Sequence, residues 1–176
     1  MSDTLRVLTV RQPWAWAIIH GGKDVENRTW NIAGAYRGPV AIHAGLAKFE
    51  QHNMASHALR AAHGTEVDAR ILYGCVTGVV DVVDVHHADD CLEASVHSLA
   101  RLYRLDPEAF YALPDSGGGG LVGRVRMCSP WAQDERHHLI LANPRPLPRP
   151  IPAKGRLGLW IPDGALQDAI WEQVDA

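Results

Sequence analysis

Residues 11–45 read RQPWAWAIIHGGKDVENRTWNIAGAYRGPVAIHAG, and this stretch decides the fold. A proline stands where a helix would begin, and the apolar residues 14–19 predict that helix. Two glycines at 21–22 provide its end, because glycine tolerates the left-handed backbone that follows a helix. KDVENRTW (23–30) predicts an extended strand, and YRGPVAIHAG (36–45) predicts a second one.

The rest of the chain adds strands around this unit and a few helices. We expect strands over 4–10, 73–85, 121–127, 137–142 and 155–161, and helices over 47–63, 91–103, a short segment after Asp106, and 163–174. Alternate prolines in 144–152 predict a crossing segment outside any central sheet, because proline donates no ladder hydrogen bond. Short strands with glycine bends and peripheral helices predict a mainly β (α+β) fold, a small antiparallel β-barrel with flanking helices.

Composition indicates an ordinary globular domain. The chain has 176 residues, of which 47% are hydrophobic and 21% charged, so it can bury a core without disulfides as one domain over 1–176. The formal charge of -3 argues against a protein that holds long nucleic acid by bulk charge. Any nucleic-acid site should therefore be local, suited to one base, one nucleotide or a short single strand.

Cysteine usage and hydropathy predict a cytoplasmic protein. Cys75, Cys91 and Cys128 are too few and too far apart for a disulfide framework or a CxxC knuckle, and they suit a reducing compartment. The N-terminus has no signal-peptide pattern, and no apolar run approaches the ~18 residues of a membrane span. We expect neither secretion nor membrane association.

The ten histidines do not form a metal-binding sequence motif. His52, His57 and His63 are spaced so that they splay around a helix, and neither HExxH nor HxE followed by CxxC occurs near His86 and His87. A GxSxG elbow is also absent, and the glycines of 116–120 lack the Gly-Lys-Ser/Thr of a phosphate loop. The sequence therefore predicts no metal site and no cofactor.

Several spaced motifs occur together and in order along the chain. They are Gln12-Pro13-Trp14-Ala15, Gly22-Lys23, Glu26, Arg28, Trp30, Tyr36-Arg37-Gly38 and Ile42-His43-Ala44, with closing segments at 139–141, 150–152 and 154–160. In these motifs the sequence resembles the ASCH domain, a member of the PUA-like superfamily. Only residues 46–72 and 86–120 lie outside the resemblance, and we expect helical inserts there.

The resemblance implies a PUA-like barrel whose cleft is lined by the lysine, glutamate and arginine of the second motif and by aromatic residues. ASCH domains are linked to recognition of RNA or modified nucleosides. Some small members are amidohydrolases that remove the acetyl group from N4-acetylcytidine with a lysine, a threonine three residues later and a glutamate, and one group has been described as ribonucleases. Lys23 matches the hydrolase lysine, whereas Glu26 stands in place of the threonine.

A chemically sensible alternative to the missing threonine uses Glu26 as general base for a water and Lys23 to stabilise the oxyanion. Because the two residues have opposite strand parity, this requires a bulge or turn at Lys23. An arginine would hold a ribose hydroxyl, phosphate or base carbonyl, a tryptophan would stack on the base, and a histidine would be a second proton carrier. The predicted substrate-binding residues are Gln12, Trp14, Arg28, Trp30, Arg37 and His43.

Two functions from different classes follow. The more concrete one is an amidohydrolase acting on N4-acylcytidine, and the alternative is a non-catalytic RNA-binding module, with a ribonuclease third. The expected partner is a modified nucleoside or short single-stranded RNA, without an obligate protein partner. A purely structural charge cluster at Lys23, Glu26 and Arg28 remains the competing explanation of the second motif.

Overall fold

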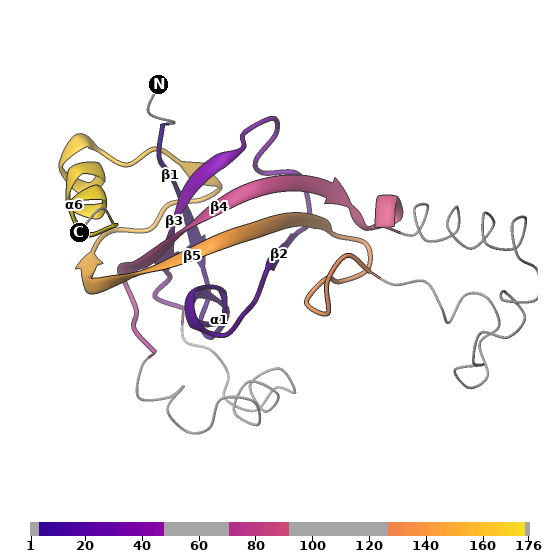
Figure 1. The fold of residues 1–176 in the computed structure, drawn as a ribbon, viewed down its shortest axis with the longest axis horizontal. Helices are drawn as coiled ribbons and strands as arrows, with labels where there is room; N and C mark the ends of the chain where they lie inside the picture. The colour runs from indigo at the N-terminus through magenta and orange to yellow at the C-terminus, as the bar shows by residue number, and fades with distance from the viewer. Residues whose placement is uncertain (1–3, 48–70, 92–126, 175–176) are drawn as a thin grey trace, which may run out of the picture.

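The structure is a computed structural model that describes residues 4–47, 71–91 and 127–174. A curled six-stranded sheet with the order β2-β5-β4-β3-β1-β6 forms its centre (Figure 1). The elements are β1 (Arg6–Val10), α1 (Trp14–His20), β2 (Val25–Arg28), β3 (Gly38–Ala44), β4 (Cys75–His87), β5 (His137–Pro152), β6 (Leu159–Trp160) and α6 (Gly164–Val174). The predicted mainly β fold with flanking helices is confirmed.

Some predicted elements cannot be compared with the structure. Several of these elements lie wholly or mostly outside the described residues. They are the helices expected over 47–63, 91–103 and after Asp106, the strand expected over 121–127, and the two inserts at 46–72 and 86–120. Among the described helices, none is both long and apolar enough to cross a membrane.

The sheet is almost entirely antiparallel and strongly bent. Within the described chain, β1 pairs in parallel with β3, and every other pairing is antiparallel. The two long strands β4 and β5 lose and regain register three times, between Val76 and Gly78, between Val79 and Asp81, and between Val82 and Asp84. Such irregularities bend a strand and increase its twist, so they account for the curl of the sheet.

The proline-rich segment is part of the sheet, so the expectation that it crosses outside is wrong. β5 runs through Pro152 and pairs with β4 as far as Cys75. The physical reason is the shortness of β2, which pairs only with residues 137–140 of β5. Beyond that point β5 has one described neighbour, β4, and prolines are tolerated where one side of a strand needs no ladder donor.

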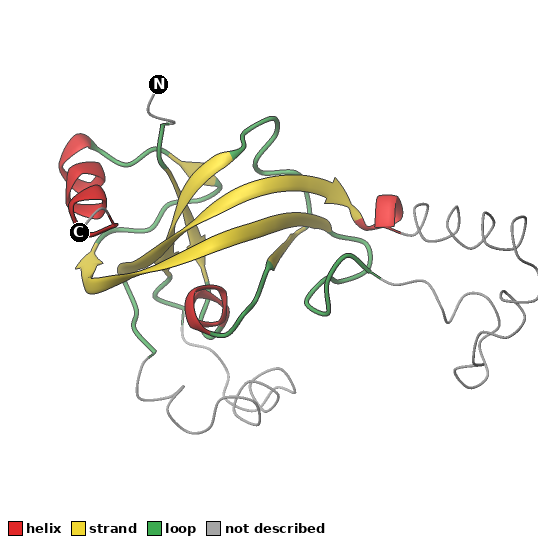
Figure 2. Cartoon of the chain, in the orientation of Figure 1, coloured by secondary structure: helices red, strands yellow, loops and turns green. Residues whose placement is uncertain are grey.

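Alternating side chains along the strands build two cores. In β1, Leu8 and Val10 join the cluster that packs against α1, whereas Val7 joins a second cluster with Ile170 of α6. Figure 2 shows α1 and α6 well apart beside the strands. The helix α6 is capped by Asp163, whose carboxylate accepts a hydrogen bond of 2.9 Å from the backbone N–H of Leu166. The sheet therefore holds α1 in a fixed position, and the site described below begins at that helix.

Gly78 of β4 allows α1 to approach the sheet, and its replacement tests this packing. A Cβ at Gly78 would lie 2.6 Å from Cδ1 of Ile19 and 2.8 Å from the carbonyl oxygen of Arg145, closer than van der Waals contact permits. We expect Gly78→Ala to destabilise the protein by roughly 1–3 kcal/mol, because α1 or β5 must move. Thermal unfolding followed by circular dichroism should show a lower Tm. Gly164→Ala is the matched control, since no heavy atom lies within 4 Å of its added Cβ; equal Tm values for the two variants would contradict the packing.

Candidate functional site

The end of α1 places Lys23 and Glu26 on the same side of the chain. Gly22 has a φ of 68°, in the left-handed region that follows many helices. The backbone N–H of Lys23 then donates to the carbonyl of Ala17 at 3.0 Å, so Lys23 belongs to the turn and not to β2, which begins at Val25. The structure therefore contains the turn at Lys23 that is needed to bring the Lys23 and Glu26 side chains together.

Lys23, Glu26 and Arg28 form a charge cluster that is mostly withdrawn from water. Lys23 and Glu26 are 5% and 7% exposed. One carboxylate oxygen of Glu26 lies 3.3 Å from Nζ of Lys23, and the other lies 3.1 Å from Nη2 of Arg28. Lys23 also donates to the carbonyl of Val25, and Arg28 donates to that of Thr9 at 3.1 Å. The cluster carries one net positive charge when both bases are protonated.

Two hollows meet at this cluster, and both are lined by Trp14 and Glu26. The smaller hollow, of about 320 Å³, is lined by Trp14, Lys23, Glu26, Asn27, Pro130, Trp131, Ala132 and Gln133. The larger one, of about 450 Å³, is lined by Thr9, Arg11, Trp14, Glu26, Arg28, Gly45, Leu46, Ala47, Arg156, Leu157 and Gly158. We call the two together the cleft. Its combined size and mixed lining suit a small organic ligand with apolar and polar ends.

In the smaller hollow, two tryptophan rings lie beside the buried ammonium group of Lys23. Nζ of Lys23 lies 5.9 Å from the ring centroid of Trp14 and 5.9 Å from that of Trp131. The two indoles meet edge to face, with centroids 6.2 Å apart and an interplanar angle of 78°. The quadrupole of each ring attracts the ammonium group. A flat, polar ring system could stack on either indole while facing the Lys23–Glu26 pair.

Hydrogen bonds fix the loop that carries Trp131. Asn27 of β2 donates to the Trp131 carbonyl at 2.8 Å, and the backbone N–H of Trp131 donates to Oγ of Ser129 at 3.0 Å. The Ser129 hydroxyl in turn donates to Asp24 at 2.5 Å. These contacts tie both ends of the Trp131 turn to the segment that contains Lys23 and Glu26, so the opposite walls of the smaller hollow are held in register.

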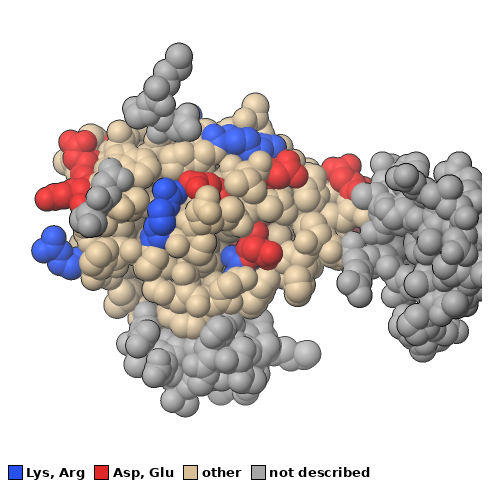
Figure 3. Space-filling view, in the orientation of Figure 1, with Lys and Arg blue, Asp and Glu red and all other residues tan. Residues whose placement is uncertain are grey.

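The larger hollow is basic. Arg11, Arg28 and Arg156 contribute to its lining, and the guanidinium of Arg156 lies 5.3 Å from the Trp160 ring centroid. Guanidinium groups bind phosphate and carboxylate oxygens in a planar, two-pronged manner. Over the face shown in Figure 3, by contrast, lysine and arginine lie scattered among acidic side chains. The larger hollow thus brings three arginines together.

Burial lowers the pKa of Lys23 below its ordinary value, and the neighbouring Glu26 opposes that shift. Since the folded-state pKa is the lower one, the buried ammonium costs stability at neutral pH. That cost is relieved as pH rises through the folded pKa toward the ordinary value.

This pKa can be measured directly because the chain contains only three lysines, Lys23, Lys48 and Lys154. In an NMR titration of the lysine side chains we expect Lys23 to lose its proton at lower pH than exposed Lys154. Glu26→Gln should lower the pKa of Lys23 further, because the carboxylate that favours the charged form is gone. A Lys23 pKa equal to that of Lys154, or one that rises in Glu26→Gln, would contradict this electrostatic description.

Four of the residues predicted from sequence come together at the cleft. Lys23 and Glu26, predicted to be catalytic, lie beside Trp14 and Arg28, predicted to bind substrate.

The other four predicted binding residues lie outside the lining of both hollows. Gln12 is buried, accepts a hydrogen bond from the Trp16 backbone and donates to the Leu72 carbonyl, so its amide is used by the fold. His43 is 1% exposed, with Nε2 3.0 Å from the carbonyl oxygen of Ala153. Arg37 donates to the carbonyls of Gly34 and Tyr36 and pairs with Asp84 at 3.6 Å, and Trp30 is 60% exposed.

Sequence reasoning missed the residues that the fold brings from a distance. Trp131, Arg11 and Arg156 all line the cleft but fall outside the predicted site. Trp131 had a usable signal, because it lies in a short Ser-Pro-Trp segment between the predicted strands 121–127 and 137–142. Arg11 directly precedes the Gln12-Pro13-Trp14-Ala15 motif and Arg156 lies in the closing segment 154–160, but neither position indicates by itself that the side chain lines a cleft.

Comparison with known proteins bears on the family of this chain. A crystal structure of ASCH from Zymomonas mobilis matches with a TM-score of 0.48 and 15% identity, covering 97% of this chain and 96% of that one. A mutant form of the Zymomonas mobilis protein matches with a TM-score of 0.46 and 14% identity over the same shares. No curated protein matches in sequence. The sequence profile of the ASCH domain matches residues 8–147, most of the chain, and the protein belongs to the ASCH domain family.

Proposed function

We propose that the cleft binds a nucleoside and hydrolyses the amide of an N4-acylated cytidine. One observation carries the proposal: the buried Lys23 and Glu26 lie 3.3 Å apart at the wall of a hollow that also has two indole rings. A carboxylate beside an ammonium group provides a proton acceptor and an oxyanion partner within reach of one carbonyl. Membership of the ASCH family supports the nucleobase part of the proposal in a general way.

The shape of the cleft suggests how the substrate lies. The cytosine ring and its acyl group occupy the smaller hollow, stacked on Trp14 or Trp131. The sugar and any phosphate extend past Glu26 into the larger hollow, toward Arg28 and Arg156. Because N4 lies across the cytosine ring from the sugar, the acyl group faces Lys23 and Glu26, and the sugar leaves the smaller hollow along the wall that Trp14 shares with the larger one.

The chemical step needs only water and these two side chains. Glu26 takes a proton from a water whose oxygen attacks the acyl carbon, and the Lys23 ammonium donates a hydrogen bond to the resulting oxyanion. When the tetrahedral intermediate collapses, the C–N4 bond breaks and Glu26 returns its proton to the departing nitrogen. The products are cytidine and the free carboxylic acid, so atoms and charge balance.

The ion pairs of Glu26 set a condition on this mechanism. Lys23 and Arg28 each contact one oxygen of the Glu26 carboxylate. A substrate carbonyl that draws the Lys23 ammonium toward itself removes one of these contacts and leaves that oxygen of Glu26 open to the attacking water. Turnover should therefore require Lys23 to be protonated and should fall at alkaline pH as this lowered pKa is passed.

The arginines of the larger hollow favour a second candidate, a module that binds RNA without turnover. Three guanidinium groups beside an aromatic wall suit a phosphate and its neighbouring base in a short single strand. In that case Glu26 serves to hold Lys23 and Arg28 in place. Binding would weaken steeply with salt, because phosphate contacts release counterions.

A chromatographic assay separates the two candidates. Purified protein is incubated with N4-acetylcytidine and with longer N4-acyl cytidines, and cytidine is quantified with time. We expect release by the wild type and by Lys154→Ala, a control at an exposed lysine outside the cleft. If no acyl cytidine is cleaved while a short single strand binds in a salt-dependent manner, the hydrolase proposal fails and the binding module replaces it.

A further inference from the structure

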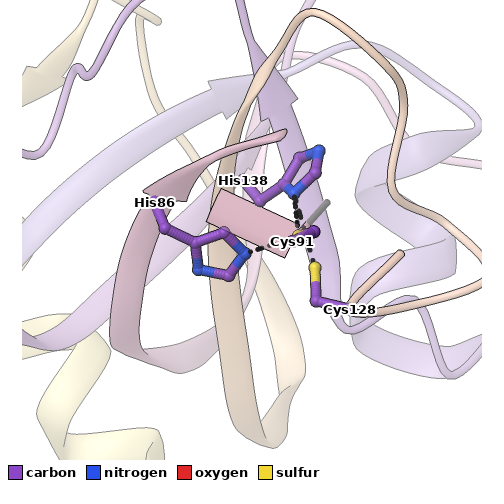
Figure 4. Close-up of side chains that lie close together, drawn as sticks. All are labelled: His86, Cys91, Cys128 and His138. Carbon is purple, nitrogen blue, oxygen red and sulfur yellow. Dashed lines mark hydrogen bonds between the residues drawn. The ribbon is translucent and has the colours of Figure 1, made fainter. Parts of the chain in front are cut away.

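Four potential metal ligands converge at the end of the sheet where β4 leaves it and β5 enters. They are His86 of β4, Cys91 in the helical turn that follows, Cys128 in the segment before β5, and His138 of β5. One ligand atom from each lies within 4.8 Å of all the others (Figure 4). Cys91 and Cys128 stand on opposite sides of residues 92–126, so the fold, and not a local motif, brings them together.

The separations match a tetrahedral metal site. Nε2 of His86 lies 3.1 Å from Sγ of Cys91, and Nδ1 of His138 lies 3.5 Å from Sγ of Cys91 and 3.4 Å from Sγ of Cys128. Tetrahedral zinc with Zn–S of about 2.3 Å and Zn–N of about 2.05 Å places sulfur and nitrogen ligands about 3.6 Å apart. These three nitrogen–sulfur separations are within about 0.5 Å of that value.

Partners outside the cluster orient both imidazoles for this role. Nδ1 of His86 lies 2.9 Å from the Asp84 carboxylate, which leaves Nε2 directed at Cys91. Nε2 of His138 donates to the Gln133 carbonyl at 2.8 Å, which leaves Nδ1 directed at the two thiols. A carboxylate or carbonyl that accepts from the remote ring nitrogen is the usual arrangement around metal-bound histidine.

The scaffold is rigid and the donors are of the right kind. His86 and His138 face each other across the β4–β5 ladder, with ring centroids 5.4 Å apart. His138 is fully buried and Cys91 is 7% exposed. Two imidazoles and two thiolates are the ligands of structural zinc sites, and thiolate excludes hard cations such as Mg²⁺ and Ca²⁺. We propose that His86, Cys91, Cys128 and His138 bind one structural Zn²⁺ ion.

This proposal departs from the expectation, drawn from sequence, that the chain has no metal site. That expectation rested on the spacing of metal ligands within one segment of sequence, whereas these four ligands lie in four different segments. It also goes beyond the proposed function, because the cluster shares no residue with the cleft. The two are linked by the loop between Cys128 and His138: Gln133, which accepts from His138, also lines the smaller hollow with Trp131.

The test is the metal content of the full-length protein prepared under reducing conditions. We expect about one zinc per chain by elemental analysis, and an intense visible cobalt spectrum with a thiolate charge-transfer band after replacement by Co²⁺. Cys128→Ser, at the exposed ligand, should reduce zinc retention after dialysis against a chelator at least about 10-fold. Cys91→Ser should reduce zinc retention to a similar extent. It provides a second test if Cys128→Ser does not fold.

His87→Ala is the matched control, because His87 and His137 form a neighbouring cross-strand pair outside the cluster, with ring centroids 4.9 Å apart. It should retain zinc like the wild type. A protein that neither contains zinc nor takes it up from zinc salt would overturn the proposal, as would a Cys91–Cys128 disulfide in its place. Zinc retained equally by both cysteine variants would also overturn it. None of these outcomes depends on whether N4-acetylcytidine is cleaved.

Discussion

Glu26→Gln should reduce the hydrolysis of N4-acetylcytidine at least about 100-fold, the usual contribution of a positioned general base. Glutamine keeps the shape of the side chain and can still accept a hydrogen bond from Lys23, but it cannot take a proton from water. The loss should therefore fall on kcat, with a much smaller change in KM. Steady-state kinetics by chromatography would measure both.

Glu172→Gln provides the control for this change, because Glu172 is exposed on α6 and lies outside the cleft. It should leave kcat and KM unchanged. Thermal unfolding of Glu26→Gln should accompany the kinetics, since the buried Lys23 and Arg28 lose their anionic partner in that variant. Undiminished kcat in a folded Glu26→Gln would exclude this residue as the base.

Trp131→Ala should weaken nucleoside binding about 5- to 150-fold, because stacking of one base on an aromatic side chain is worth roughly 1–3 kcal/mol. Trp131 lines the smaller hollow opposite the Lys23 segment, and its removal opens that wall. Isothermal titration with cytidine, the product of the proposed reaction, would measure affinity without interference from turnover. The same variant should leave the Lys23–Glu26 ion pair in place, since Lys23 keeps its contacts with Glu26 and with the Val25 carbonyl.

Comparison of Trp30→Ala with Trp131→Ala shows which of the two tryptophans stacks on the base. The sequence predicts Trp30 as a stacking residue, yet its side chain is largely exposed and lies outside both hollows. We expect its affinity for cytidine to equal that of the wild type. If Trp30→Ala loses affinity and Trp131→Ala does not, the ligand binds elsewhere than in the cleft.

The fold was predictable where local sequence determines local structure. The helix that follows Pro13 and its end at Gly21 follow from residue types with strong backbone preferences. The proline-rich half of β5 was not predictable, because its acceptance into the sheet depends on how short β2 is. The length of β2 depends on its pairing with β5, and the sequence of neither segment alone specifies it.

The candidate site divides in the same way. Lys23, Glu26 and Arg28 lie within six residues, so one motif revealed all three. Trp131 reaches them from more than one hundred residues away, through the hydrogen bond of its carbonyl to Asn27. The cluster of His86, Cys91, Cys128 and His138 is likewise assembled by the β4–β5 pairing. Proximity of this kind depends on tertiary structure and has no periodic signature in the sequence.

The most direct measurement of the central claim is a single-turnover experiment with protein in excess over N4-acetylcytidine, so that even slow chemistry is visible. The wild type, Lys23→Ala and the exposed control Lys154→Ala are compared at neutral pH. We predict one cytidine per substrate from the wild type and Lys154→Ala, and a rate at least about 100-fold lower from Lys23→Ala, which has lost its oxyanion partner. Cytidine release at the same rate from Lys23→Ala, or none from the wild type at a protein concentration that binds all of the substrate, would contradict the account.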